Sequence, residues 1–223
     1  MLATAAMACG FLATLFPAGF ASIRDLGKAA ALPGDSAKSS PIRADAAVPR
    51  AIVALGAQAI YFLAAAAIWA YFEAIGRGFG LSLAQVGAAL AASAIAGMAG
   101  SGAVIVIGAR LPRVLLIAAG TIVSIGSVLL LAQGAGYLSF LVSACLFNFA
   151  WNYTFPYQMG VLAQLDRHGS VAVISLVVQL AGLALGPAIG ALLLTGAGYG
   201  QILYACGACF LVSLVLFAWS GRS

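Results

Sequence analysis

Apolar residues fill seven long stretches of the chain, and most charged residues lie between them. The stretches cover residues 1–23, 51–72, 81–108, 112–133, 137–162, 170–195 and 199–219. Each is near or above the roughly 20 apolar residues that a helix needs to cross about 30 Å of hydrocarbon. Because none of them alternates apolar and polar residues with a period of two, the strands of a membrane barrel are excluded. The pattern predicts an all-α membrane protein with seven transmembrane helices.

Positive charges between the stretches predict how these helices are oriented. If the stretches are threaded back and forth through a bilayer, nine of the ten Lys and Arg residues fall on one side, and only Arg77 falls on the other. The nine are Arg24, Lys28, Lys38, Arg43, Arg50, Arg110, Arg113, Arg167 and Arg222. Because cytoplasmic loops are enriched in Lys and Arg, we expect the N-terminus outside the cell and the C-terminus in the cytoplasm.

The composition supports a lipid environment by a separate route. Hydrophobic residues make up 64% of the chain and charged residues 7%, with a mean hydropathy of +1.13. A soluble domain would carry about 25% charged residues. The net charge of +5 comes from the loops, and no basic cluster interleaved with aromatic residues accompanies it. We therefore expect the lipid bilayer as a partner and no nucleic acid.

The reactive residue types do not form a recognisable catalytic or metal-binding set. The four cysteines, which are Cys9, Cys145, Cys206 and Cys209, all lie in apolar stretches. The C-x-x-C at Cys206 has no neighbouring cation that would activate a thiol, so packing roles are favoured. A single histidine, His168, cannot build a metal site alone. Since no paired acids or Ser/His set occurs within a span, we expect neither an enzyme nor a cofactor.

The stretches divide the chain into three parts. Residues 1–23 are followed rather than preceded by positive charges, which indicates a retained helix and not a cleaved signal peptide. Residues 24–50 combine three prolines, several serines and five cationic residues, so we expect a mobile cytoplasmic linker. The six stretches in residues 51–223 are joined mostly by short turns, which predicts one compact helical bundle.

Several strings and their order carry a family resemblance. They are WAYFEAIGRGFGLSLAQVGAAL from Trp69, GARLPR from Gly108, LDRHG from Leu165 and QLAGLALGPAIGALLL from Gln179. With a helix, a basic linker and six helices in that order, the chain resembles the C-terminal half of a major facilitator superfamily (MFS) transporter, preceded by the last helix of the N-terminal half. The resemblance implies secondary transport of a small organic solute across a bacterial inner membrane.

The chain also departs from that family in two respects. The family's cytoplasmic signature turn has an Asp where this chain has Ala109. In addition, the family forms its substrate cavity between two halves, and five helices of the N-terminal half have no counterpart here. We therefore expect transport to require a separate N-terminal half or self-association. The alternative is a non-transporting membrane remnant or a partner-binding subunit.

Two predicted helices carry candidate residues for a substrate cavity. In the family, the helices corresponding to residues 51–76 and 137–162 line the cavity. Each carries polar and aromatic side chains at helical spacing. The candidates are Gln58, Tyr61, Phe62 and Trp69 on the first helix and Asn148, Trp151, Asn152 and Phe155 on the second. The two asparagines would either contact solute or bond across helices, and the latter is worth about 0.6–2 kcal/mol each.

Two further groups of residues have predicted roles. Gly182, Gly186 and Gly190 form a tandem G-x-x-x-G ridge, which predicts close packing against a neighbouring helix. Glu73 and Arg77 are four residues apart at a helix end and would pair in the headgroup region. The alternative for Glu73 is a proton or cation site, since apolar surroundings would favour its neutral form.

Overall fold

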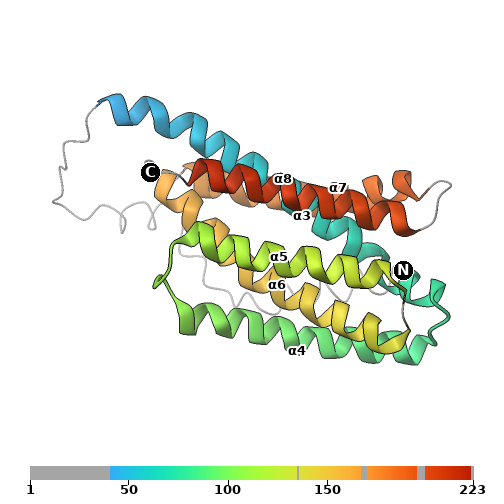
Figure 1. Cartoon of the computed structure of the whole chain (residues 1–223). Coiled ribbons are helices and arrows are strands. Elements are labelled where there is room, and N and C mark those ends of the chain that lie inside the picture. The colour runs from blue at the N-terminus through green and yellow to red at the C-terminus, as the bar shows by residue number, and fades with distance from the viewer. Residues whose placement is uncertain (1–40, 135, 167–169, 195–198, 222–223) are drawn as a thin grey trace, which may run out of the picture. The chain divides into compact units, whose positions relative to one another are not determined.

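The computed structural model describes residues 41–134, 136–166, 170–194 and 199–221, and every regular element in these segments is an α-helix (Figure 1). The helices are α3 (Pro41–Gly78), α4 (Leu83–Ile107), α5 (Arg113–Ala132), α6 (Tyr137–Leu165), α7 (Ser170–Leu193) and α8 (Tyr199–Ser220). The prediction of an all-helical protein is confirmed for these residues. The predicted helix over 1–23 lies outside the described residues.

Five of the helices are long and apolar enough to cross a membrane. The five candidate spans are Pro49–Gly78, Leu83–Ile107, Arg113–Ala132, Val171–Leu193 and Tyr199–Ser220. These spans indicate an integral membrane protein. The remaining helix, α6, is 29 residues long, but Asn148, Asn152 and Gln158 lower the hydropathy of its central turns.

Helix α3 is longer than the apolar pattern predicted. It begins at Pro41, so residues 41–50, which the sequence assigned to the linker, are helical. Proline is well tolerated in the first position of a helix, where its missing N–H would have no partner. Pro49 lies inside the helix and removes one backbone donor there. Both prolines were expected to lie in the linker before a helix starting at residue 51. The helix starts at residue 41 instead.

Short connections join most of the helices, as predicted. Between α3 and α4, Gly80 adopts a positive φ of 79°, which a residue with a side chain rarely adopts. Ser82 then caps α4, because its hydroxyl accepts from the Gln85 amide at 3.2 Å and the Gln85 side chain accepts from the Ser82 amide at 2.9 Å. This reciprocal capping box fixes where α4 begins.

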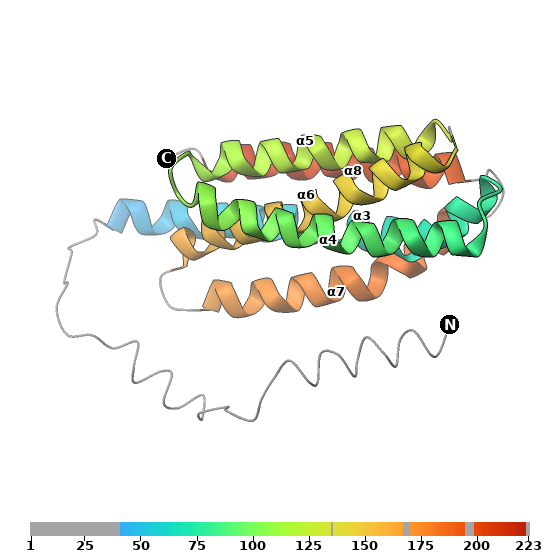
Figure 2. The ribbon, with the colours of Figure 1, turned by 90° about the horizontal axis from the view of Figure 1, so that it is seen from below.

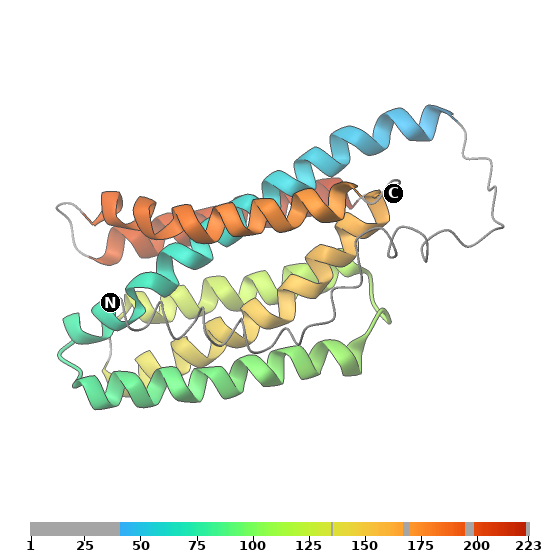
Figure 3. The same ribbon diagram turned by 180° about the vertical axis from the view of Figure 1, so that it is seen from behind.

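The contacts of the first three helices, α3 to α5, correspond to those of the last three, α6 to α8. Helix α3 packs against α7 and α8, and α6 packs in the same way against α4 and α5. Helices α5 and α8 contact each other, as do α3 and α6. Exchanging α3 with α6, α4 with α7 and α5 with α8 therefore maps these contacts onto one another. Figure 2 shows α7 on the opposite side of the bundle from α5, and Figure 3 shows α3 and α6 running obliquely across it.

The core lies along α3 and α6, and the other helices cover it unequally. Within an 18-residue window of each span, 61% of α3 is buried, whereas only 17% of α4 and 17% of α7 is buried. Buried aromatic side chains fill the centre, among them Phe62, Phe72, Phe140, Phe147 and Phe210. The outer faces of α4 and α7 carry exposed apolar side chains such as Ile95 and Leu176, as helices in contact with lipid do.

Candidate functional site

Glycines bring α7 into close contact with α3. A Cβ atom added at Gly182 would lie 2.9 Å from Phe62 Cβ, and one added at Gly186 would lie 2.7 Å from the Leu63 carbonyl oxygen. At Gly190 it would lie 2.6 Å from Tyr71 Cε2. Because Phe62, Leu63 and Tyr71 all belong to α3, the three glycines face that helix. The short distances leave no room for a side chain at any of them. The structure thus places the G-x-x-x-G ridge in a helix interface.

Glycines play the same part between α4 and α6. An added Cβ atom at Gly97 would lie 2.7 Å from Asn148 Oδ1 and 2.8 Å from Asn152 Nδ2. One turn further along, Gly100 contacts the Phe149 backbone so closely that a side chain there would collide with the carbonyl group. The two predicted amides of α6 therefore lie directly against a bare stretch of α4.

The amides form a short hydrogen-bonded chain between these helices. Asn152 Nδ2 donates to Asn148 Oδ1 at 2.9 Å and also to the Asn148 carbonyl oxygen at 2.9 Å. Asn148 Nδ2 donates in turn to Ser93 Oγ at 3.2 Å, and the Ser93 hydroxyl donates to the Leu90 carbonyl oxygen. Among the described residues, Asn152 Oδ1 accepts no hydrogen bond, so it is available to a ligand.

An open hollow of about 250 Å³ lies beside this chain of amides. Its lining residues are Trp69, Asn148, Trp151 and Asn152. The two indole rings meet edge to face with their centroids 6.5 Å apart. Trp69 also stacks on Phe147 at 6.3 Å and is 39% exposed. We call this feature the aromatic–amide hollow.

The structure places the other four cavity candidates elsewhere. Tyr61 and Gln58 are fully buried: the Tyr61 hydroxyl lies 3.3 Å from Ser124 Oγ on α5, and Gln58 Oε1 accepts from Ser175 Oγ on α7 at 2.8 Å. Phe62 and Phe155 pack edge to face behind the hollow, with Phe62 6.0 Å from the Trp151 ring. Gln58 lies away from the hollow because of its position along the axis of α3. It shares a helix face with Trp69, but eleven residues separate the two by about 16 Å.

Ser93 and Gly97 contact the two amides that line the hollow, although neither was among the candidates expected from the sequence. They lie four residues apart on α4, which matches the spacing of Asn148 and Asn152. Within a helix rich in Ala, Gly and Ser, nothing marked these two positions. Glu73 and Arg77 are both exposed near the end of α3, and the pairing predicted for them stays a prediction.

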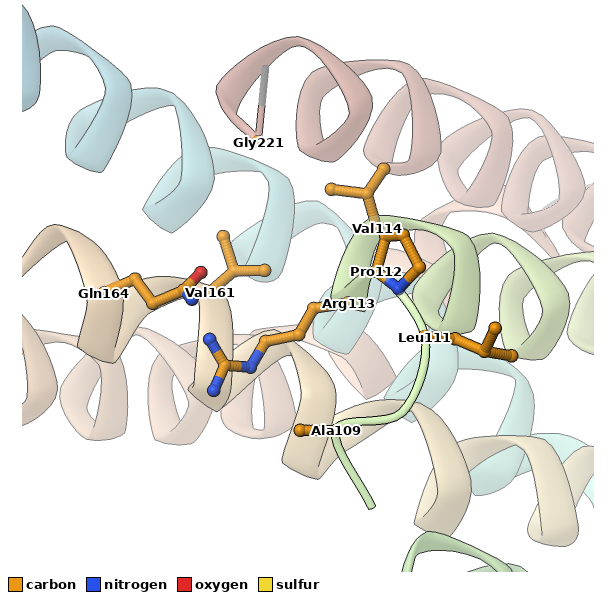
Figure 4. Close-up of a pocket in the computed structure, with 8 residues that line it drawn as sticks. All are labelled: Ala109, Leu111, Pro112, Arg113, Val114, Val161, Gln164 and Gly221. Atoms are coloured by element: carbon orange, nitrogen blue, oxygen red, sulfur yellow. The ribbon is translucent and has the colours of Figure 1, made fainter. Parts of the chain in front are cut away.

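A second, larger hollow of about 440 Å³ lies where α5 begins (Figure 4). Its lining residues are Ala109, Leu111, Pro112, Arg113, Val114, Val161, Gln164 and Gly221. Figure 4 shows the Arg113 side chain directed from the start of α5 towards α6. From the sequence, Arg113 was expected only to be one of the loop charges that orient the helices.

Within the described part of the chain, no group of three or more His, Cys, Asp or Glu side chains is placed to hold a metal ion. Cys145, Cys206 and Cys209 are free thiols within helices. A comparison of the chain with protein-family models, curated proteins and solved structures finds no match.

Proposed function

We propose that residues 51–223 form one half of an MFS-type secondary transporter that carries a small organic solute. The observation that supports this most is the exchange relation between the helix contacts of α3–α5 and α6–α8. If all six helices cross the bilayer in turn, three-helix units run through it in opposite directions. Inverted repeats of this kind are the usual construction of secondary transporters, including each half of an MFS protein.

The position of the aromatic–amide hollow also supports the proposal. Asn148 and Asn152 lie in the middle third of α6, and transporters bind their substrates near the bilayer midplane. The hollow is open on one side, so it would form only part of a cavity. A separate N-terminal half or a second copy of the chain would supply the facing wall.

The lining of the hollow indicates the chemistry of the solute. Trp69 and Trp151 offer apolar surfaces, while Asn148 and Asn152 offer amide groups, and no charged side chain is among the lining residues. Such a surface suits an uncharged molecule with a flat or apolar part and a few hydrogen-bonding groups. We therefore propose a neutral solute rather than an ion.

A second candidate function is that of a non-transporting membrane subunit. The observation in its favour is that Asn148 bonds to Ser93 across α4 and α6 and that Gly97 packs directly on both amides. Amides used in this way hold helices together and need no solute. The two functions differ in what happens when a ligand is offered to the hollow.

Tryptophan fluorescence can test the proposal, because the chain has only three tryptophans. In a Trp219→Phe variant, the two that remain are Trp69 and Trp151, which both line the hollow. We expect a panel of neutral aromatic and sugar-like solutes to include one that changes this emission saturably. Asn152→Ala should weaken that binding by about tenfold, since an amide hydrogen bond to a ligand contributes about 1–1.5 kcal/mol.

The control is the double variant Trp69→Phe, Trp151→Phe, whose only tryptophan is the exposed Trp219. Its emission should not respond to the same solute. If no solute binds and Asn152→Ala only lowers thermal stability, the subunit function is favoured instead. A solute that does bind should show no saturable uptake into vesicles holding a single copy of the chain, because half of the cavity is missing.

A further inference from the structure

Arg113 presents a cation that no side chain in the described residues neutralises. It forms no hydrogen bond or ion pair with them, although its side chain is partly buried between α5 and α6. Retaining an unpaired charge in a partly buried position is costly, so buried charges are usually paired. We propose that the 440 Å³ hollow beside Arg113 binds a phosphate group, supplied by the headgroup of an anionic phospholipid.

The structure makes specific room for this side chain. A Cβ atom added at Gly160 on α6 would lie 2.8 Å from Arg113 Nε and 3.0 Å from its Cδ. The arginine therefore lies across the bare surface of α6 with its guanidinium group beside the hollow (Figure 4). Gln164, one turn further along α6, adds an amide to the same lining. A planar guanidinium group with a nearby amide suits the oxygen atoms of a phosphate.

The hollow lies where lipid headgroups would be found. Arg113 begins the candidate span Arg113–Ala132, and Gly221 follows the end of the span Tyr199–Ser220. The ends of two membrane spans mark the interface between hydrocarbon and water. Basic pockets between helices at this depth bind anionic lipid headgroups. This placement depends on the spans alone and does not require the chain to be a transporter.

The surrounding charges are compatible with an anion. No side chain caps the N-terminus of α5, and Val114 in its first turn also lines the hollow, so the positive end of the helix dipole adds to the Arg113 charge. Arg110 is exposed on the same connection. Asp166, the carboxylate that follows α6, accepts a hydrogen bond from the Ala172 amide at 2.9 Å and is therefore held at the start of α7.

The test is lipid binding to the purified chain of residues 1–223 in detergent, measured by native mass spectrometry. Phosphatidylglycerol should bind more tightly than phosphatidylcholine of the same chain length. Arg113→Gln should weaken phosphatidylglycerol binding at least about tenfold, as expected for the loss of a charged hydrogen-bonding partner. The matched control Arg110→Gln removes an equal charge from the same connection and should change binding less than about threefold, because that side chain is exposed.

A second variant keeps the proposal testable if Arg113→Gln folds poorly. Gly160→Ala retains the charge but moves the guanidinium group away from α6, and it should also weaken phosphatidylglycerol binding. Glycerol phosphate in solution should bind far more weakly than the lipid. If it binds as tightly, the phosphate site is supported but a lipid source is overturned. Equal losses in Arg113→Gln and Arg110→Gln, or no preference for phosphatidylglycerol, would overturn the site altogether.

Discussion

Asn148 and Asn152 show how far single residues can be understood from their spacing. Their separation of four residues predicts that they share a face of one helix, and both line the same hollow with Trp151. Helical spacing does not say which neighbouring helix faces them. The contacts with Ser93 and Gly97 on α4 depend on how the helices pack, so they could not be predicted from the sequence.

The tight contact at Gly97 makes a residue-level prediction. Gly97→Ala would place a methyl group 2.7 Å from Asn148 Oδ1 and 2.8 Å from Asn152 Nδ2. We expect the amide chain to be displaced and the free energy of unfolding to fall by about 1–3 kcal/mol, as overpacking usually causes. The measurement is the melting temperature in detergent.

A matched control exists on the same helix. At Gly87, an added Cβ atom would meet nothing within 4 Å. Gly87→Ala should therefore leave the melting temperature unchanged or raise it slightly, since alanine favours helices more than glycine does. If the two variants behave alike, the contact between α4 and the amides is not as close as described.

At the level of elements, the helices were predictable because hydropathy is a local property. A run of about 20 apolar residues is enough to predict a membrane helix without knowledge of its neighbours. The ends were less predictable: α3 starts at Pro41, where proline and charge suggested a linker. The partner of each helix was not predictable at all. The Gly182–Gly190 ridge indicated close packing, but nothing in its sequence pointed to α3.

The interface between α7 and α3 gives a prediction at this scale. At Gly186, an added side chain would meet the Leu63 carbonyl oxygen at 2.7 Å and the Ala67 amide nitrogen at 2.8 Å, both of which are backbone atoms that cannot rotate away. Gly186→Leu should therefore force the helices apart and lower the melting temperature markedly. Ala184→Leu, on the exposed side of the same helix, should have little effect. Equal melting temperatures for the two variants would place the ridge against lipid.

For the whole molecule, the relation between α3–α5 and α6–α8 exists only in the contacts between helices. Hydropathy predicts how many helices there are, but it does not show that α3 and α6 have equivalent partners. The relation makes α6 the counterpart of α3, which is a candidate span. If the relation reflects an inverted repeat, α6 crosses the membrane as well, even though its amides lower its hydropathy.

Cysteine accessibility tests directly whether α6 crosses. In a variant whose four native cysteines are replaced by alanine, single cysteines would be introduced at Gln133 before α6 and Gln164 near its end, both exposed positions. If α6 spans the bilayer, an impermeant thiol reagent added to whole cells should label only one of them. The distribution of Lys and Arg predicts that the cysteine at position 133 is labelled, as is one introduced at position 78. Cysteines at positions 164 and 110 should stay unlabelled.

Two other outcomes are informative. Labelling at positions 133 and 164 from the same side would show that α6 does not cross, and the inverted three-helix arrangement would then be lost. Labelling at positions 164 and 110 in place of 133 and 78 would keep that arrangement but reverse the orientation of the chain.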